Sequence, residues 1–222
     1  MIQAISLKNC KFSYVPNKLV INIDQLDIAS GERVFLHGPS GHGKSTLLNL
    51  ASGVIKANSG VVSVLGNDFT NLAQSKRDHL RGEKIGYIFQ IFNLIPYLTV
   101  KENIILPCLI NKKRANQDVD KQAEELIDSL GMREHINKKV TDLSIGQQQR
   151  VAAARALIGN PEIIIADEPT SALDEKNTKE FMNLLMKEWE KRKFTLLFVS
   201  HDERLKSYFE RSISLPEINH HD

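Results

Sequence analysis

A glycine-rich loop that ends in lysine and serine is the most specific chemical signal in this sequence of 222 residues. The loop follows an apolar stretch at Arg33–His37 and leads into a helical pattern that begins at Lys44. Glycines let successive backbone N–H groups approach phosphate oxygens, and the following helix N-terminus adds partial positive charge. Lys44 would contact β- and γ-phosphates, and the Ser45 hydroxyl would bind Mg²⁺. The pattern G-x-x-x-x-G-K-S therefore predicts a nucleoside triphosphate site made by Gly38, Pro39, Ser40, Gly41, His42, Gly43, Lys44, Ser45 and Thr46.

A pair of carboxylates directly follows a second apolar stretch, at Ile163–Ala166. Such a strand delivers its terminal side chains to the sheet edge where ligands of α/β proteins bind. Asp167 is placed to hold Mg²⁺, directly or through water, and Glu168 to polarise an attacking water. Taken alone, an Asp-Glu pair is more often a solvated strand end. Together with the glycine loop, the pair favours a catalytic interpretation.

The pattern of apolar residues predicts the elements that would position these groups. Four short, largely β-branched or aromatic segments are typical of strands buried on both faces, at Arg33–His37, Ile85–Phe89, Ile163–Ala166 and Thr195–Val199. Helical periods lie between them, at Lys44–Ser52, Val100–Ile110 and Asn177–Arg192. Antiparallel strands are expected around Ile5–Leu7, Ile21–Ile23 and Val61–Leu65. The sequence thus predicts an α/β fold with a parallel core and an antiparallel β edge.

Composition limits the class of protein and its organisation. The 29 Lys and Arg residues nearly balance 27 Asp and Glu, so the charge of +2 gives no general case for nucleic-acid binding. Residues 1–5 lack the layout of a secretory signal, and no apolar run is long enough to span a bilayer. We expect one domain over residues 1–222, with a core at 1–92 and 160–222 and a mostly helical lobe inserted at 93–159.

Further motifs surround the Asp-Glu strand in a fixed order. Leu143–Ala152 precedes it with Leu-Ser-Ile-Gly-Gln-Gln-Gln-Arg-Val-Ala, and Pro169–Asp174 follows it with Pro-Thr-Ser-Ala-Leu-Asp. These segments resemble the signature motif and the D-loop of ATP-binding cassette (ABC) ATPases. Three other residues agree in order and spacing: they resemble the adenine-stacking aromatic, the Q-loop glutamine and the switch histidine, and they are Tyr14, Gln90 and His201.

The resemblance covers nearly the whole chain and implies the fold, cofactors and site of that family. The fold would be a P-loop NTPase core with a mixed or parallel sheet, an antiparallel β subdomain and an inserted α-helical subdomain. ATP and Mg²⁺ would be the cofactors, and Gln90 would contact the nucleotide and the metal ion. His201 would hydrogen-bond the γ-phosphate, Glu168 would be the catalytic carboxylate, and Lys44 would bind the phosphates. Tyr14 would stack on adenine, although Phe12 is an alternative.

The signature motif also has a physical interpretation of its own. Ser144 and Gln147 form Ser-x-x-Gln, a capping box that predicts a helix running to about Leu157. By itself such a box is usually an ordinary helix cap. The resemblance implies that Ser144, Gly146 and Gln147 complete the γ-phosphate site of a second copy in a head-to-tail homodimer. Family members usually have glycine where this chain has Ile145, which neither adopts positive φ readily nor lets phosphate approach closely.

The segment from Gln90 to Val100 is dense in large apolar residues and suits a socket for a partner's helix. Its sequence resembles most closely the ABC ATPases of lipoprotein release and macrolide export. The resemblance implies an integral membrane permease docked near Gln90–Val100 and a location on the cytoplasmic face of the membrane. The alternatives are a regulatory cassette with weak turnover, a soluble ABC ATPase acting on nucleic acid or ribosomes, and a small-molecule P-loop kinase.

Overall fold

The computed structural model describes residues 3–115 and 118–220. The ends of the predicted domain 1–222 and residues 116–117 of the predicted helical lobe lie outside the described residues. The chain divides into two compact units. The first unit comprises Met1–Arg81 and Thr195–Asp222, and the second unit comprises Gly82–Phe194. The predicted helical lobe at 93–159 falls wholly inside the second unit, and its standing as a separate lobe stays a prediction.

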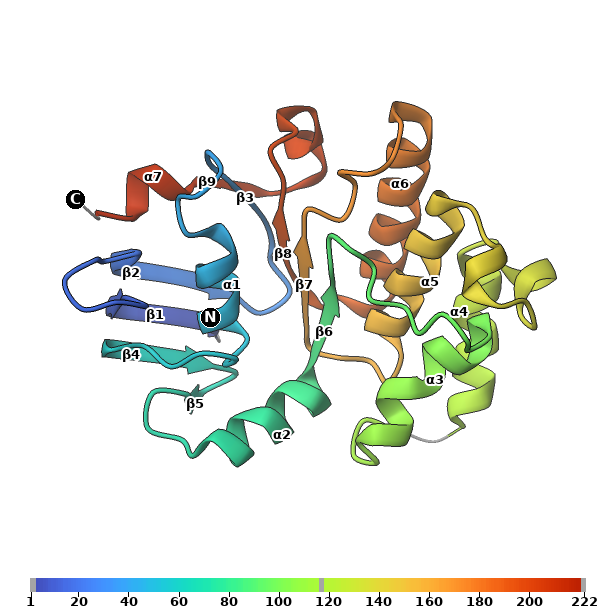
Figure 1. Ribbon diagram of the computed structural model, residues 1–222, viewed down its shortest axis with the longest axis horizontal. Coiled ribbons are helices and arrows are strands. Elements are labelled where there is room, and N and C mark those ends of the chain that lie inside the picture. Colours follow the sequence, from blue (N-terminus) through green and yellow to red (C-terminus); the bar gives the residue numbers. More distant parts are fainter. Residues whose placement is uncertain (1–2, 116–117, 221–222) are drawn as a thin grey trace. The chain divides into compact units, whose positions relative to one another are not determined.

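The first unit contains an antiparallel sheet in the strand order β2-β1-β4-β5 (Figure 1). Its strands are β1 (Gln3–Phe12), β2 (Ile21–Ala29), β4 (Ser59–Val64) and β5 (Asn67–Asp68). Alternating apolar residues such as Ile21 and Ile23 are buried, as a sheet with one covered face requires. Gly60 has a φ of +81°, and a Cβ there would lie 2.1 Å from the Asn9 carbonyl oxygen, so only glycine fits. The predicted antiparallel strands are confirmed.

The first unit also contains three parallel strands, with β3 (Arg33–His37) between β8 (Thr195–Val199) and β9 (Arg211–Ser214). The rings of Phe35 and Phe198 stack at 6.3 Å between centroids and join β3 to β8. The predicted strands at β3 and β8 are confirmed, whereas β9 was not predicted because its sequence Arg-Ser-Ile-Ser has no apolar run. Helix α1 (Lys44–Ala51) follows β3, and α2 (Gln74–Lys84) contains the junction between the units.

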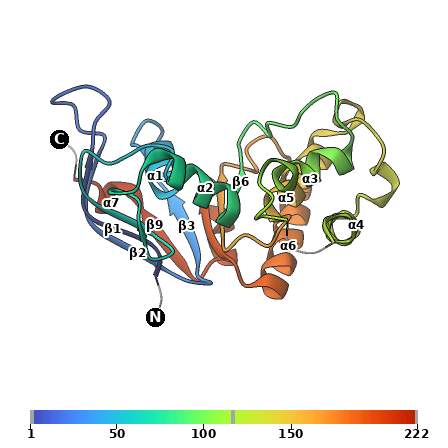
Figure 2. The same ribbon diagram turned by 90° about the horizontal axis from the view of Figure 1, so that it is seen from below.

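A short C-terminal helix, α7 (Leu215–Ile218), completes the first unit after the 3₁₀ turn Glu203–Tyr208 and β9. It lies beside β2 and β9 in both views (Figures 1 and 2). Leu215 is fully buried there, so the helix is anchored by its first residue.

The second unit pairs β6 (Ile85–Ile88) with β7 (Ile163–Asp167) in parallel and surrounds them with helices. These are α3 (Val100–Ile110), α4 (Val119–Ser129), α5 (Ile145–Leu157) and α6 (Glu175–Arg192), with 3₁₀ turns at Arg133–His135 and Val140–Asp142. Polar N-caps start all four: Thr99 and Ser144 form complete capping boxes, and Asp118 and Asp174 accept a backbone N–H. Between 93 and 159, the described residues form no strand, as predicted.

Arg114 joins several segments of the second unit through hydrogen bonds to backbone carbonyl oxygens. Among the described residues, none of its hydrogen bonds is to a carboxylate. Its Nε donates to Ile158 O at 3.0 Å, and one terminal nitrogen donates to Ala156 O at 2.7 Å. The other terminal nitrogen donates to Ile85 O at 2.8 Å and to Gly82 O at 3.3 Å. Burial lowers the pKa of Arg114 to about 10. The guanidinium thereby joins the end of α5 to the start of β6.

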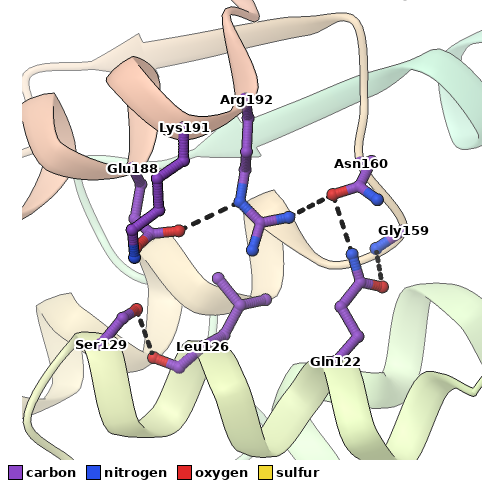
Figure 3. A network of polar contacts seen from close by, with 8 residues as sticks. All are labelled: Gln122, Leu126, Ser129, Gly159, Asn160, Glu188, Lys191 and Arg192. Atoms are coloured by element: carbon purple, nitrogen blue, oxygen red, sulfur yellow. Dashed lines mark hydrogen bonds and ion pairs between the residues drawn. The ribbon is translucent and has the colours of Figure 1, made fainter.

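A second polar network joins α4, the turn before β7 and the end of α6 within the second unit (Figure 3). Gln122 accepts from Gly159 N at 3.0 Å and donates to the Asn160 side-chain oxygen at 2.9 Å. Arg192 donates a hydrogen bond to the same Asn160 oxygen. Arg192 Nε also donates to the buried Glu188 carboxylate at 3.0 Å. The network fixes the chain just before β7, the strand that carries the predicted carboxylates.

Candidate ATP site

The phosphate loop lies between β3 and α1 and needs glycine at two turns. Gly41 and Gly43 have φ of +80° and +91°, and Gly43 is the N-cap of α1. Added to Gly43, a Cβ would lie 3.0 Å from the Val20 carbonyl oxygen. No side chain of the described residues caps α1. The helix therefore presents its first backbone N–H groups toward any anion seated in the loop.

Lys44 folds back over the loop. Its Nζ donates to Gly38 O at 2.8 Å and to Pro39 O at 3.0 Å. Ser45, next along, is exposed, so its hydroxyl is accessible to a cation. Thr46 is buried and lies 3.3 Å from the Tyr14 hydroxyl. The ammonium group is thus held where a triphosphate could replace its carbonyl partners.

Tyr14 is better suited than Phe12 to stack on a base. The Tyr14 side chain is 61% exposed, whereas Phe12 is buried. The two rings meet edge to face, with centroids 4.8 Å apart. Because Phe12 supports Tyr14 from the side, an exposed ring face of Tyr14 remains for an adenine.

His201 follows β8 at the same edge from which the loop leaves β3. The strands are parallel with Leu36 opposite Val199, and Ser200 N donates to Leu36 O at 3.2 Å. The exposed His201 therefore emerges beside Gly38, in agreement with the predicted order of the motifs. The first unit brings together Tyr14, the loop residues 38–46 and His201.

The second unit places the remaining predicted residues at the carboxyl ends of β6 and β7. These strands are parallel with Ile88 opposite Ala166, so Gln90 and the Asp167–Glu168 pair leave the sheet at one edge. Both carboxylates are half-buried, and Glu168 has a φ of +43° at the start of a turn closed by Ser171 N. Burial and a hydrogen bond with Asp167 raise the pKa of Tyr87 above its ordinary value. Tyr87 thus stays neutral and fixes the Asp167 side chain.

The signature segment starts α5 as predicted. Ser144 Oγ accepts from Gln147 N at 3.3 Å, and Gln147 Oε1 accepts from Ser144 N at 2.9 Å. Ile145 is the first residue of α5, is 53% exposed, and is not among the described residues with positive φ. The expected conflict between Ile145 and positive φ is therefore absent, since its backbone is helical. The exposed Ile145 side chain still adds bulk at the N-terminus of α5, where a phosphate is expected to approach.

His135 contacts the signature motif, although nothing in the sequence marks it as a residue of the site. The ring Nε2 of His135 lies 2.8 Å from Gln147 Nε2. Because Gln147 Oε1 already accepts from Ser144 N, its amide N–H must donate to His135, which requires the tautomer protonated at Nδ1. The contact spans 12 residues and has no sequence pattern that would have revealed it.

A second residue of the site that has no sequence signal lies in the C-terminal segment of the first unit. Asn219 is 4% exposed and donates to Val20 O at 2.9 Å and to His42 O at 3.4 Å. It also accepts from Asn22 N at 2.7 Å. The partner in the phosphate loop is 177 residues away in sequence, so no local motif could predict the contact.

A surface pocket of about 320 Å³ follows Gln90 in the second unit. It is lined by Ile91, Phe92, Asn93, Leu94, Pro96, Val140, Thr141 and Gln148. Arg155 holds its rim by donating to Phe92 O and Asn93 O, each at 2.6 Å. Five of its eight lining residues belong to the segment predicted as a socket, and one of these five, Ile91, is 81% exposed.

Each unit, taken by itself, offers an oxygen donor of the kind that a magnesium nucleotide uses. Within 3–115 and 118–220, no group of three or more His, Cys, Asp or Glu side chains is placed to hold a metal ion. Mg²⁺ usually takes one or two protein ligands and completes its shell with phosphate and water. The exposed Ser45 hydroxyl and the half-buried Asp167 carboxylate are donors of that kind.

The loop between β3 and α1 and the carboxylates after β7 define a P-loop nucleoside triphosphatase with a capped signature helix. The family model described as ABC transporter matches residues 21–171. The chain belongs to this family of ABC transporter ATPases, which bind and hydrolyse ATP.

Similar proteins extend the match to almost the whole chain. The lipoprotein-releasing system ATP-binding protein LolD of Hydrogenovibrio crunogenus is 36% identical, over 96% of this chain and 94% of LolD. A dimeric structure of the ABC transporter cassette MJ0796, from Methanocaldococcus jannaschii, matches with a TM-score of 0.84 and 39% identity over 95% of this chain and 93% of that one. A post-hydrolysis MJ0796 dimer bound to ADP and phosphate has a TM-score of 0.83, with 38% identity and the same coverage.

No helix of the described residues is long and apolar enough to cross a membrane.

Proposed function

We propose that this chain is the ATPase subunit of an envelope machine that releases or exports lipoproteins through a membrane-embedded partner. The observation that carries the proposal is the likeness to LolD over 96% of the chain at 36% identity. The pocket after Gln90 supports it, because a transport ATPase needs a surface that transmits its movement. The partner would hold the chain at the cytoplasmic face of the membrane.

The nucleotide would be bound mainly by the first unit. Backbone N–H groups of residues 40–46 surround the phosphates, Lys44 exchanges its carbonyl partners for β- and γ-phosphate oxygens, and Tyr14 stacks on adenine. Ser45, Gln90 and Asp167 would hold Mg²⁺, directly or through water. When bound, Mg²⁺ neutralises charge on the β- and γ-phosphates.

Hydrolysis would depend on two side chains that face the γ-phosphate. Glu168 accepts a proton from the attacking water as the water oxygen bonds to phosphorus and the bond to the ADP oxygen breaks. His201 donates a hydrogen bond to the γ-phosphate and positions the water. The strained φ of Glu168, +43°, supports this role, since such conformations gather at functional sites.

A second copy would complete each site. Ser144, Gly146 and Gln147 present the N-terminus of α5, and such a helix end attracts anions. The dimeric structures of MJ0796 support a homodimer for this chain, and the head-to-tail arrangement is what the resemblance to the family implies. The exposed Ile145 side chain would crowd this contact and slow turnover relative to a glycine, so Ile145→Gly should raise the ATPase rate.

The role of Glu168 is tested by measuring ATP hydrolysis and ATP affinity in Glu168→Gln. We expect turnover to fall by about a hundredfold or more with ATP affinity retained, because the amide keeps the shape and loses the base. Glu162→Gln is the matched control, since Glu162 is exposed just before the opposite end of β7. Equal phosphate release by Glu168→Gln and Glu162→Gln would contradict the assignment.

The partner is tested by purifying tagged Glu168→Gln with ATP from detergent-solubilised membranes. We expect a multi-span membrane protein to copurify and Ile91→Asp to lose it, while Leu109→Asp, equally apolar and 65% exposed outside the pocket, keeps it. Recovery of nucleic acid or ribosomes instead would favour the soluble ABC alternative. The same complex purified with the unaltered chain should hydrolyse ATP, and if that complex stays silent, the regulatory cassette is favoured.

A further inference from the structure

The C-terminal segment of the first unit packs directly against the phosphate loop. Leu215 and Pro216 of α7 lie beside Gly38, where an added Cβ would meet Pro216 Cδ at 3.1 Å. Beyond α7, His220 N donates to Asn22 O at 2.9 Å, and Asn22 Nδ2 donates to His220 O at 2.7 Å. The segment is therefore fastened to β2 on one side and rests on the start of the loop on the other.

Asn219 sits between these two attachments and uses both ends of its amide. Its oxygen accepts from Asn22 N at 2.7 Å, which holds the side chain in one orientation. Its nitrogen then points at two carbonyl oxygens, Val20 O at 2.9 Å and His42 O at 3.4 Å. A side chain 4% exposed with three hydrogen bonds has little freedom to move, so it acts as a rigid brace.

The brace acts on the peptide unit that joins His42 to Gly43. In a planar trans peptide the N–H points opposite to the C=O of the preceding residue, and the described residues contain no cis peptide. Holding His42 O toward Asn219 therefore turns the Gly43 N–H to the other side. Val20 O, the second acceptor, lies close to Gly43, since a Cβ added there would be 3.0 Å from it. The same asparagine thus contacts the peptide directly and also holds the neighbouring Val20 carbonyl.

We infer that Asn219 is a positioning residue for the phosphate site: it orients the Gly43 N–H toward the bound nucleotide's phosphates. The inference rests on the proposed role of the loop in phosphate binding. Glycine at position 43 leaves this peptide free to rotate in the absence of a restraint. Asn219 supplies the restraint before the nucleotide arrives, which lowers the ordering cost of binding.

The experiment compares MgADP affinity, by calorimetry, between the unaltered chain and Asn219→Asp. Aspartate keeps the acceptor for Asn22 N and replaces both donors by an oxygen that faces the Val20 and His42 carbonyl oxygens. Asn219→Leu, which is neutral and of similar volume, removes the same donors without adding a charge near the phosphates, and it should weaken MgADP binding as well. We expect the dissociation constant to rise at least threefold. Thr195→Val is the matched control: it removes a buried acceptor of Gly31 N, at 2.9 Å, elsewhere in the first unit. This control should lose stability and keep its MgADP affinity.

A spectroscopic readout separates positioning from general stability. In ¹⁵N-labelled protein the Gly43 amide resonance should shift on MgADP addition, and that shift should shrink in Asn219→Asp but not in Thr195→Val. Unchanged affinity and an unchanged Gly43 shift in Asn219→Asp would overturn the inference, as would equal losses in both variants. Failure of the unaltered chain to bind MgADP would instead refute the proposed phosphate site.

Discussion

Replacing Arg114 by methionine should destabilise the second unit more than any other single arginine change in it. Methionine keeps most of the aliphatic volume but removes every donor. Four carbonyl oxygens lose a partner, those of Gly82, Ile85, Ala156 and Ile158. Two of these belong to the end of α5, where backbone carbonyls have no helical partner of their own.

The magnitude follows from these contacts and from burial. A hydrogen bond to a charged group contributes about 1.5–3 kcal/mol, and the three at or below 3.0 Å are of ordinary length. Removing a buried cation recovers part of this, because its desolvation no longer opposes folding. We therefore expect a net loss of about 2–4 kcal/mol in the free energy of unfolding.

Urea unfolding followed by tryptophan fluorescence measures this loss, because the single tryptophan, Trp189, is buried in α6 of the second unit. For an m-value of about 2 kcal/mol per molar urea, the midpoint should fall by about 1–2 M. Arg133→Met is the matched control, since Arg133 is 56% exposed and its ion pairs with Glu124 and Asp128 contribute about 0–1 kcal/mol. Equal midpoints for the two variants would refute the reasoning.

Other changes in the second unit have equally definite outcomes. Gly86→Ala should lower the thermal unfolding midpoint, because its Cβ would lie 2.1 Å from Ala156 O, and an unchanged midpoint would contradict this steric argument. His135→Phe should lower the ATPase rate by about two- to fivefold with little change in ATP affinity, since Gln147 loses an acceptor; an unchanged rate counts against that contact. Burial raises the pKa of Glu188, but hydrogen bonds from Lys191 and Arg192 outweigh it and the net shift is downward. Its ion pairs therefore stabilise the fold above the ordinary carboxyl pKa of 4.5, and this stability is lost as pH falls below it. Glu188→Gln should reduce the loss of stability on acidification below that pKa, and an unchanged acid slope would contradict this.

Elements with strong local signals could be predicted from the sequence. Apolar segments gave the positions of β3, β6, β7 and β8, and the Ser144–Gln147 pair marked the start of α5 to the residue. Strand β9 escaped prediction because it is stabilised by pairing with β3 rather than by its own residues. The helical φ of Ile145 follows from the same capping box, because Ser144 as the N-cap makes Ile145 the first residue of α5.

The residues of the candidate site also fall into two groups, those that the sequence predicts and those that only the folded structure brings into contact. The phosphate loop, the Asp167–Glu168 pair and the signature motif could be read from the sequence, because phosphate chemistry requires particular residue types at short spacings. The contacts of Asn219 with His42, of His135 with Gln147 and of Arg114 with Ile158 were decided only by the tertiary structure. Two of these three contacts end on backbone carbonyls, which every residue carries. Residue type therefore does not reveal such an acceptor, and only folding brings a distant side chain within hydrogen-bonding distance of it.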